Sequence, residues 1–204
     1  MIAGIVLGAG KSERMRRSKL NLPLGSKKLI EWVLESVTLS LLDEIFLVIK
    51  PDDKNITEIA RKWNVKIVYN PDYKKGMSTS IQKALIKLDT QDKEIDGFCL
   101  ILGDQPFINH KIINQLIKNF TRGKKEIVVP YYQGNRGNPV LFDMEWKKDF
   151  MEITGDTGGR VLIRKYPDHI KKVDILDKGI LFDIDREEDY SKAKRYFRDK
   201  GKLV

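Results

Sequence analysis

The sequence predicts a single α/β domain over residues 1–204, with a doubly wound, mostly parallel sheet and helices on both faces. Three observations lead to this prediction. The chain has 204 residues, 41% of them hydrophobic, which suits one domain with its own core. Short apolar runs rich in β-branched residues alternate with stretches of helical periodicity. No linker, repeat or low-complexity segment divides the sequence.

The individual elements follow from these runs in chain order. Met77, Ile81, Ala84 and Leu88 recur at helical steps, which predicts a helix with one buried face. The predicted strands are Ile2–Leu7, Glu44–Ile49, Val65–Tyr69, Gly97–Leu102 and Ile127–Pro130. The predicted helices are Leu29–Leu41, Lys54–Trp63, Met77–Leu88, His110–Phe120, Gly159–Tyr166 and Glu187–Arg198. Ligands of such sheets bind outside the carboxyl ends of the strands, so we expect the chemistry in the segments that follow them.

The composition indicates an anionic partner and excludes several kinds of site. Lys and Arg number 38 against 29 Asp and Glu, a net charge of +9 that suits nucleic acid, a membrane surface, a nucleotide or a phosphorylated metabolite. Cys99 is the only cysteine, which excludes an internal disulfide framework and a four-cysteine zinc site. No apolar run approaches the ~20 residues of a membrane span, and the first residues do not resemble a signal peptide. We therefore expect a soluble cytoplasmic protein.

A glycine-rich turn follows the first predicted strand. Its sequence nearly matches two phosphate-binding motifs, but the glycine spacing of each fails. Glycines at this place still let backbone N–H groups face an anion without a side chain in the way. Because a basic cluster follows at once, we interpret the turn as a phosphate-binding loop, the alternative being a tight turn with a solvated basic face. The residues concerned are Leu7, Gly8, Ala9, Gly10, Lys11, Ser12, Arg14, Arg16, Arg17 and Lys19.

Two acidic segments are candidates for a metal site. Asp104 directly follows the apolar strand that ends at Leu102, where an α/β enzyme can hold Mg²⁺ between phosphates; a surface turn is the alternative. Asp183 and Asp185 alternate in an extended segment and would therefore point the same way. Asp185 is alternatively the N-cap of the last predicted helix. The carboxylates predict an Mg²⁺-dependent enzyme with Asp104 at the metal and a second carboxylate from the segment around Asp183 and Asp185.

The segment from Leu7 to Met15, together with Lys19 and Pro23, resembles the signature L-A-[AG]-G-x-S-x-R-M-G-x-x-K of the nucleotidyltransferases that act on molybdopterin, the MobA-like NTP transferases. The resemblance implies a variant of the Rossmann fold like that of the nucleotide-diphospho-sugar transferases. It also implies that the loop backbone holds the nucleotide while Arg14 and Lys19 neutralise its phosphates. Arg16 stands where the family has glycine.

Further segments share this resemblance and assign the remaining site residues. Gly76-Met77-Ser78-Thr79-Ser80 resembles G-M-x-x-S, which implies nucleotide binding by Gly76, Ser78 and Ser80. Segments similar to R-G-H-P-V-L-F and G-D-x-G-x-R imply an acceptor site, with Asn138 in place of histidine. Gly103-Asp104-Gln105-Pro106 and the segment around Asp183 and Asp185 also match, which implies that Asp185 joins Asp104 at the metal. The acceptor residues implied are Arg136, Asn138, Asp156 and Arg160.

Taken together, these matches predict a transferase that moves CMP from CTP onto molybdopterin or its metal-loaded form and releases pyrophosphate. The alternatives within the fold are GTP as donor or a sugar or polyol phosphate as acceptor. A molybdoenzyme or its chaperone is a possible protein partner. The alternative of another class is a nucleic-acid-binding module that uses the basic segment Lys192–Val204, although such a charge run is more typical of a solvated helix face, and we expect neither nucleic acid nor membrane as partner.

Overall fold

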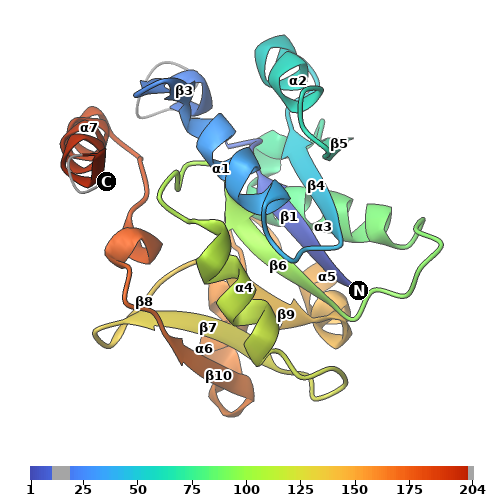
Figure 1. The fold of residues 1–204 in the computed structure, drawn as a ribbon. Helices are drawn as coiled ribbons and strands as arrows, with labels where there is room; N and C mark the ends of the chain where they lie inside the picture. The colour runs from blue at the N-terminus through green and yellow to red at the C-terminus, as the bar shows by residue number, and fades with distance from the viewer. Residues whose placement is uncertain (11–18, 202–204) are drawn as a thin grey trace.

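The computed structural model describes residues 1–10 and 19–201, and its centre is an eight-stranded mixed sheet. The strand order is β10-β7-β9-β6-β1-β4-β5, with the short β8 paired to β7 (Figure 1). The strands are β1 (Ile2–Leu7), β4 (Glu44–Ile49), β5 (Lys66–Tyr69), β6 (Gly97–Leu102), β7 (Ile127–Tyr132), β8 (Asn135–Arg136), β9 (Val140–Asp143) and β10 (Ile170–Asp174).

The order of the strands creates a switch point beside β1. The chain runs outward from β1 through β4 to β5, then returns to place β6 on the other side of β1, and all of these pairs are parallel. The carboxyl ends of β1 and β6 meet in register, with Leu7 opposite Leu102. A crevice is expected at such a point, because the strand order reverses there: the chain first adds strands on one side of β1 and then on the other.

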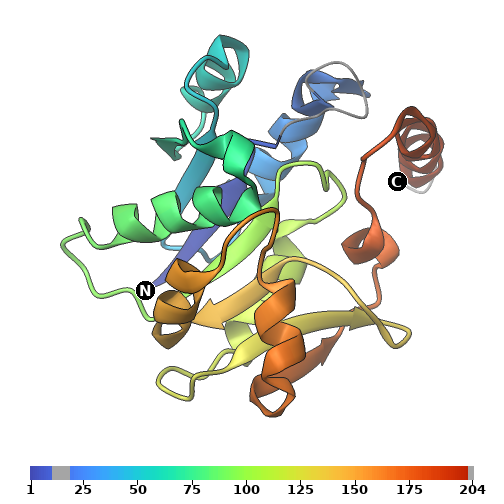
Figure 2. The same ribbon diagram turned by 180° about the vertical axis from the view of Figure 1, so that it is seen from behind.

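Helices cover both faces of the sheet, as the sequence predicts (Figures 1 and 2). On one face, α1 (Leu29–Thr38), α2 (Lys54–Ala60) and α4 (His110–Asn119) pack on side chains such as Ile2 and Val6. On the other face, α3 (Met77–Leu88), α5 (Lys147–Glu152) and α6 (Arg160–Lys165) pack on Ala3 and Ile5. The alternation of these β1 residues between the two cores follows from the period of two in a strand.

The sequence prediction differs from the structure mainly in the second half of the sheet. The antiparallel strand β9 lies between β6 and β7, and the edge strand β10 lies beside β7; neither is among the predicted strands. β9 has only four residues, all buried, and β10 carries exposed charge, so neither shows the pattern of a typical strand. Helices α1 and α2 also end three residues earlier than predicted, at Thr38 and Ala60.

The last helix, α7 (Glu187–Gly201), forms a third core with a two-stranded ribbon of β2 (Pro23–Leu24) and β3 (Lys27–Lys28). The Tyr190 hydroxyl donates a hydrogen bond to the carbonyl oxygen of Pro23. The rings of Trp32 and Phe197 lie with centroids 5.0 Å apart. The segment 183–185, which precedes α7, is thereby anchored close to the ribbon. The remaining short helices are η2 (Lys19–Asn21), η3 (Tyr73–Lys75), η4 (Met144–Trp146), η5 (Pro167–His169) and η6 (Lys178–Leu181).

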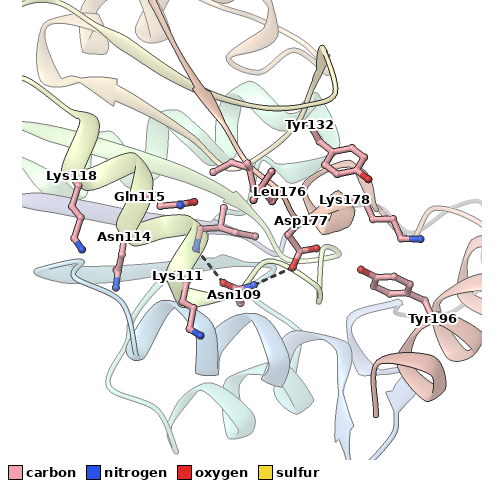
Figure 3. A pocket seen from close by; sticks show the side chains of 12 residues that line it. Asn109, Lys111, Asn114, Gln115, Lys118, Tyr132, Leu176, Asp177, Lys178 and Tyr196 are labelled. Carbon is pink, nitrogen blue, oxygen red and sulfur yellow. Dashed lines mark hydrogen bonds between the residues drawn. The ribbon is translucent and has the colours of Figure 1, made fainter. Parts of the chain in front are cut away.

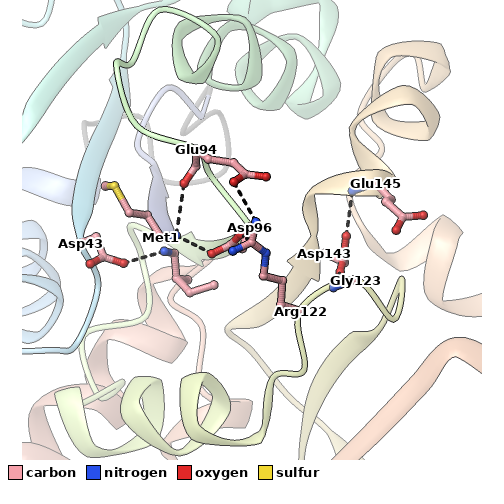
Figure 4. Close-up of polar contacts among 9 residues, drawn as sticks. Met1, Asp43, Glu94, Asp96, Arg122, Gly123, Asp143 and Glu145 are labelled. Carbon is pink, nitrogen blue, oxygen red and sulfur yellow. Dashed lines mark hydrogen bonds and ion pairs between the residues drawn. The ribbon is translucent and has the colours of Figure 1, made fainter.

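A charged cluster anchors the amino end of β1 (Figure 4). The amino group of Met1 lies 2.5 Å from Oδ2 of Asp96 and donates to the carbonyl oxygen of Glu94. Arg122 in turn binds the carboxylates of Glu94 and Asp96, each at 2.7 Å. These contacts fix the amino end of β1, at the other end of the strand from its carboxyl end at Leu7. No helix in residues 1–10 and 19–201 is long and apolar enough to cross a membrane.

Candidate active site

A cavity of about 450 Å³ lies at the carboxyl ends of β1, β4 and β6, at the switch point of the sheet. Twelve of the candidate site residues predicted from the sequence meet in it. Those twelve are Leu7, Gly8, Ala9, Gly10, Lys19, Gly76, Ser80, Asp104, Asp156, Arg160, Asp183 and Asp185. The others in its lining are Leu20, Lys50, Asp53, Tyr73, Met77 and Leu102. Lys11, Ser12 and Arg14 lie outside the described residues.

Lys19 joins the two acidic segments at the floor of this cavity. Its ammonium group donates to Oδ2 of Asp104 at 2.5 Å and to Oδ1 of Asp185 at 2.9 Å. The backbone N–H of Ile184 donates to the carbonyl oxygen of Asp104 at 3.2 Å, which holds the second acidic segment beside the first. Side chains from η2, from the end of β6 and from the segment before α7 therefore converge on one point.

The cluster contains more acid than base. Burial raises the pKa of the Asp104 carboxyl above its ordinary 3.8; the charge of Lys19 opposes this rise, whereas Asp185 and Asp183 add to it. Burial lowers the pKa of Lys19, but the negative charges and hydrogen bonds of Asp104 and Asp185 outweigh it, so the net shift is upward. Negative charge favours protons on every member of the cluster, so it raises the pKa of Lys19 and adds to the effect of burial on the pKa of Asp104.

One oxygen of this cluster has no partner. Oδ1 of Asp104 is buried and accepts no hydrogen bond within the described part of the chain. Among the described residues, no group of three or more His, Cys, Asp or Glu is arranged to hold a metal ion. Two carboxylates with a spare buried oxygen still fit Mg²⁺, which usually keeps several waters and substrate phosphates as ligands. The residues present are therefore suited to a hard divalent cation that binds together with a nucleotide.

The glycine turn after β1 lies close to the neighbouring strands. The N–H of Gly8 donates to the carbonyl oxygen of Val48 at 2.8 Å, and a Cβ at Gly8 would lie only 3.1 Å from that oxygen. Ala9 is buried and Gly10 is exposed, with open space where its Cβ would be. The turn thus extends from the packed end of β1 to an open backbone segment at the cavity, where a ligand can approach closely.

A buried asparagine organises the start of α3. Asn70 is fully buried, and its amide nitrogen donates to the hydroxyl oxygens of Thr79 and Ser80, each at 2.9 Å. Gly76, just before the helix, has φ +116°, and a Cβ there would lie 2.2 Å from the carbonyl carbon of Gly155. Only glycine fits this crossing of two loops. Ser80, which lines the cavity, is therefore held near the start of α3 by the hydrogen bond from Asn70.

Asp156 and Ser78 contribute to that crossing. Oδ1 of Asp156 accepts from the N–H of Met77 at 3.3 Å, and the N–H of Ser78 donates to the carbonyl oxygen of Gly155 at 3.2 Å. The loop before α6 thus satisfies two of the N–H groups that a helix start leaves unpaired. Ser78 is buried and is not part of the cavity lining. Its local role is to anchor α3, whereas Asp156 both caps α3 and lines the cavity.

The remaining acceptor candidates lie on two different elements. Arg160 begins α6 and lines the cavity. Arg136, on β8, is half-buried and outside the cavity lining, as is Asn138. The backbone N–H of Asn138 donates to the carbonyl oxygen of Ile180, and its peptide bond to Pro139 is cis. The structure therefore brings Arg160 to the cavity together with the nucleotide-binding candidates but leaves Arg136 and Asn138 outside its lining.

Lys50 lines the cavity but is not among the site residues predicted from the sequence. This residue directly follows β4, and its ammonium group lies 5.1 Å from the centroid of the Tyr73 ring in the cavity. The rule that ligands bind after strand ends would have identified it. Tyr73 and Asp53 carry no such signal, because each lies within a loop or at a helix start whose position depends on the rest of the fold.

A second, more open cavity of about 780 Å³ lies on the outer side of α4 (Figure 3). Its polar groups serve local structure: Asn109 caps α4 through Ile112, and Asp177 accepts from the N–H of Gly179 at 2.8 Å. Leu176, at the rim, is 98% exposed. The cavity at the switch point, rather than this one, unites the strand-end residues and is the candidate active site.

The fold and the cavity define a nucleotide-binding α/β protein of the transferase type, with a glycine turn after the first strand and an acidic cluster after the central one. The family described as "MobA-like NTP transferase domain" matches residues 4–170, and the chain belongs to this family of nucleotidyltransferases. The acidic cluster at Asp185 lies beyond the matched residues, so the structure, rather than the match, connects it to the site.

Several relatives are similar over much of the chain. The purine catabolism protein PucB of Bacillus subtilis is 26% identical and covers 95% of this chain and 96% of its own. The molybdenum cofactor cytidylyltransferase of Escherichia coli is 25% identical, with 96% of each chain covered. A probable molybdenum cofactor guanylyltransferase of Natranaerobius thermophilus is 29% identical, with 66% of this chain and 62% of its own covered.

Solved structures share the fold. A nucleotidyl transferase from Methanothermobacter superposes with a TM-score of 0.82 at 19% identity, and the match covers 98% of this chain and 99% of its own. A likeness at this identity concerns the fold alone. The sequence prediction of a doubly wound α/β domain of the nucleotide-diphospho-sugar transferase type is therefore confirmed, as is the resemblance to the MobA-like nucleotidyltransferases.

Proposed function

We propose that this nucleotidyltransferase moves CMP from CTP onto the phosphate of molybdopterin, or of its metal-loaded form, and releases pyrophosphate. The single observation that carries the proposal is the convergence of Lys19, Asp104 and Asp185 beside the glycine turn in one cavity. A triphosphate needs both features, since the turn offers backbone N–H groups and the cluster accommodates cations that neutralise phosphate charge.

The reaction needs no side-chain nucleophile. An oxygen of the acceptor phosphate attacks the α-phosphorus of CTP and forms the new P–O bond, while the bond to the β-phosphate oxygen breaks and its electrons leave with pyrophosphate. Catalysis then depends on in-line positioning and charge stabilisation. Lys19 and Arg14 stabilise the phosphate charge, and the backbone of Gly8 and Gly10 holds the nucleotide. The other nucleotide-binding residues proposed are Leu7, Ala9, Lys11, Ser12, Gly76, Ser78 and Ser80.

Asp104 and Asp185 would hold a divalent cation, which we propose to be Mg²⁺. The spare buried oxygen of Asp104 and the acid excess of the cluster support this assignment. When bound, the ion would neutralise charge on the triphosphate. Lys19, which contacts both carboxylates, would supply a second positive charge beside the ion.

The choice of CTP rests on the motifs G-D-Q-P, G-M-S-T-S and R-G-N-P-V-L-F, which resemble the cytidylyl branch more than the guanylyl branch. The similarity to a molybdenum cofactor cytidylyltransferase supports this choice, and the similarity to a guanylyltransferase keeps GTP as the alternative donor. Arg136, Asn138, Asp156 and Arg160 form the proposed acceptor side. The product would pass to a molybdoenzyme or its chaperone in the cytoplasm.

The α7 aromatics argue against the nucleic-acid alternative. Tyr196 packs edge-on against Phe107, and Phe197 packs against Trp32 in the third core. Rings engaged in this way are not available as a stacking platform for bases. The exposed lysines and arginines of α7 are therefore a solvated helix face in this proposal, and we propose no nucleic acid and no membrane as partner.

The test is a pyrophosphate-release assay with molybdopterin, Mg²⁺ and each of the four nucleoside triphosphates. We expect turnover with CTP, a product with the mass of the cytosine dinucleotide cofactor, and no turnover without Mg²⁺. Turnover with GTP but none with CTP would overturn the donor assignment. Pyrophosphate release with CTP that requires a sugar or polyol phosphate in place of molybdopterin would overturn the acceptor assignment.

A further inference from the structure

Three arginine side chains gather at the edge of the candidate site. Arg160 and Arg164 are four residues apart on α6, so their side chains share one face of that helix. α6 packs through Leu162 and Ile163 against the core that includes β7 (Figures 1 and 2). Arg136 of β8 pairs with Tyr131 of β7, and the charges of both α6 arginines act on it. The three guanidinium groups therefore form one cluster, which we call the arginine cluster.

The arginine cluster has no ion-pair partner in the described part of the chain. Within residues 1–10 and 19–201, no carboxylate forms an ion pair with Arg136, Arg160 or Arg164. Burial and then the charges of Arg160 and Arg164 lower the pKa of Arg136, which is half-buried. Lys171, on the neighbouring strand β10, is by contrast paired with Glu126 at 3.6 Å. Like charges held together repel one another, and a bound anion relieves this repulsion.

We propose that Arg164 is a third acceptor-binding residue, which completes with Arg136 and Arg160 a site for the phosphate monoester of the acceptor. The inference rests on the proposed function and goes beyond it by assigning Arg164 to the acceptor side. Arg160 belongs both to the arginine cluster and to the cavity lining, so a phosphate bound there lies next to the nucleotide site. Guanidinium groups suit this anion because their N–H donors match phosphate oxygens in pairs.

The arginine cluster would also favour the reactive form of the acceptor. A phosphate monoester carries between one and two negative charges at neutral pH, with a second pKa near 6. Three cations favour the dianion, whose oxygen attacks the α-phosphorus without first losing a proton. A phosphodiester carries a single charge and satisfies the arginine cluster less well. The site therefore selects an acceptor with a terminal phosphate.

Lys165 offers a matched control for Arg164. It is the next residue on the same helix, it is exposed, and its ammonium group lies 5.0 Å from the centroid of the Tyr166 ring. Removing either side chain lowers the net charge of α6 by the same amount. A difference between Arg164→Ala and Lys165→Ala therefore reports position rather than total charge.

The kinetic test measures molybdopterin and CTP dependence separately, with Mg²⁺ present. We expect Arg164→Ala to raise KM for molybdopterin about tenfold, as expected for one lost charged hydrogen bond, and to leave KM for CTP within about twofold. Arg164→Lys should fall between this variant and the parent protein, which also guards against a folding defect, and Lys165→Ala should match the parent. An unchanged molybdopterin KM in Arg164→Ala, or an equal rise in Lys165→Ala, would overturn the proposal.

A binding test separates this proposal from the proposed function. Inorganic phosphate should raise the Tm of the parent protein and of Lys165→Ala more than that of Arg164→Ala, against sodium chloride of equal ionic strength. If no nucleoside triphosphate supports transfer but this difference is found, the proposed reaction fails while the anion site stands. If phosphate shifts the Tm of all three proteins equally, or of none, the arginine cluster is not the phosphate site.

Discussion

The ammonium group of Lys19 lies 2.5 Å from Oδ2 of Asp104, although 85 residues separate the two in the chain. This contact closes the floor of the candidate active site and brings the end of β6 to the short helix η2. Asp104 is the more buried of the two carboxylates that Lys19 contacts. The contact joins a residue that we assign to phosphate binding with one that we assign to the metal.

Removing the charge of Lys19 should impair catalysis more than folding. We expect Lys19→Ala to lower kcat/KM by about 10²- to 10³-fold, the usual cost of one group aimed at developing charge. Steady-state kinetics with CTP and molybdopterin measure the effect. Lys62→Ala removes an exposed lysine of the same charge outside the cavity and should retain activity. Comparable losses in the two variants would contradict the assignment.

The metal assignment predicts a change in the Mg²⁺ requirement. Asp104→Asn should reduce turnover by about 10²-fold or more, because it removes a charge that holds and orients the cation. Asp185→Asn should raise the Mg²⁺ concentration needed for half-maximal rate with a smaller loss at saturation. A magnesium titration of both variants measures this, with the exposed Asp168→Asn as control. Near-normal activity of Asp104→Asn would refute the metal site.

The raised pKa of Asp104 predicts that this carboxylate costs stability. Burial, followed by the nearby acids, makes the folded protein hold this proton more tightly than the unfolded chain, whose ordinary value is 3.8. Stability due to this group is therefore full below about 3.8 and is lost as the pH rises through the folded value. Without metal, Asp104→Asn should be more stable than the parent protein at pH 7, and the gap should close toward pH 4. Urea unfolding across this range measures it; a less stable variant at pH 7 would contradict the prediction.

The crossing at Gly76 predicts a strong effect of one methyl group. Gly76→Ala combines φ +116° with a Cβ 2.2 to 2.4 Å from backbone atoms of Gly155 and Asp156. We expect a loss of about 2 kcal/mol or more in the free energy of unfolding. Gly10→Ala is the matched control, because its Cβ would meet nothing within 4 Å. Equal stability of the two variants in denaturant titrations would mean that the two loops do not cross so closely.

The third core predicts that α7 supports the site from a distance. Phe197→Ala removes the ring that packs on Trp32, which should lower the free energy of unfolding by about 2 kcal/mol. Activity should also fall, because α7 anchors the segment that carries Asp185. The neighbouring Arg198→Ala changes an exposed side chain and should affect neither quantity. Full activity in Phe197→Ala would show that Asp185 does not need this anchor.

Local patterns predicted much of the fold and part of the site. The bounds of β1, β4, β6 and α3 agree with the sequence prediction, because these elements have clear periodicity and clear turn residues at their ends. The sequence also predicted that Asp104 follows a buried strand. The strands β9 and β10 could not be predicted in the same way. A short buried run and a charged edge strand acquire their pairing from neighbours that are distant in sequence.

The alternation of strands and helices and the glycine turn can be predicted from the sequence, because each depends on residues a few positions apart, and the excess of basic charge follows from composition. Which charges meet, however, depends on how the elements pack. Lys19 and Asp185 are 166 residues apart, and packing of α7 on the β2–β3 ribbon accompanies their approach to 2.9 Å. The arginine cluster likewise depends on packing, since Arg136 is 24 residues before Arg160 in the chain. Contacts of this kind depend on which faces of the elements pack together, and the chain pattern around each residue does not contain that information.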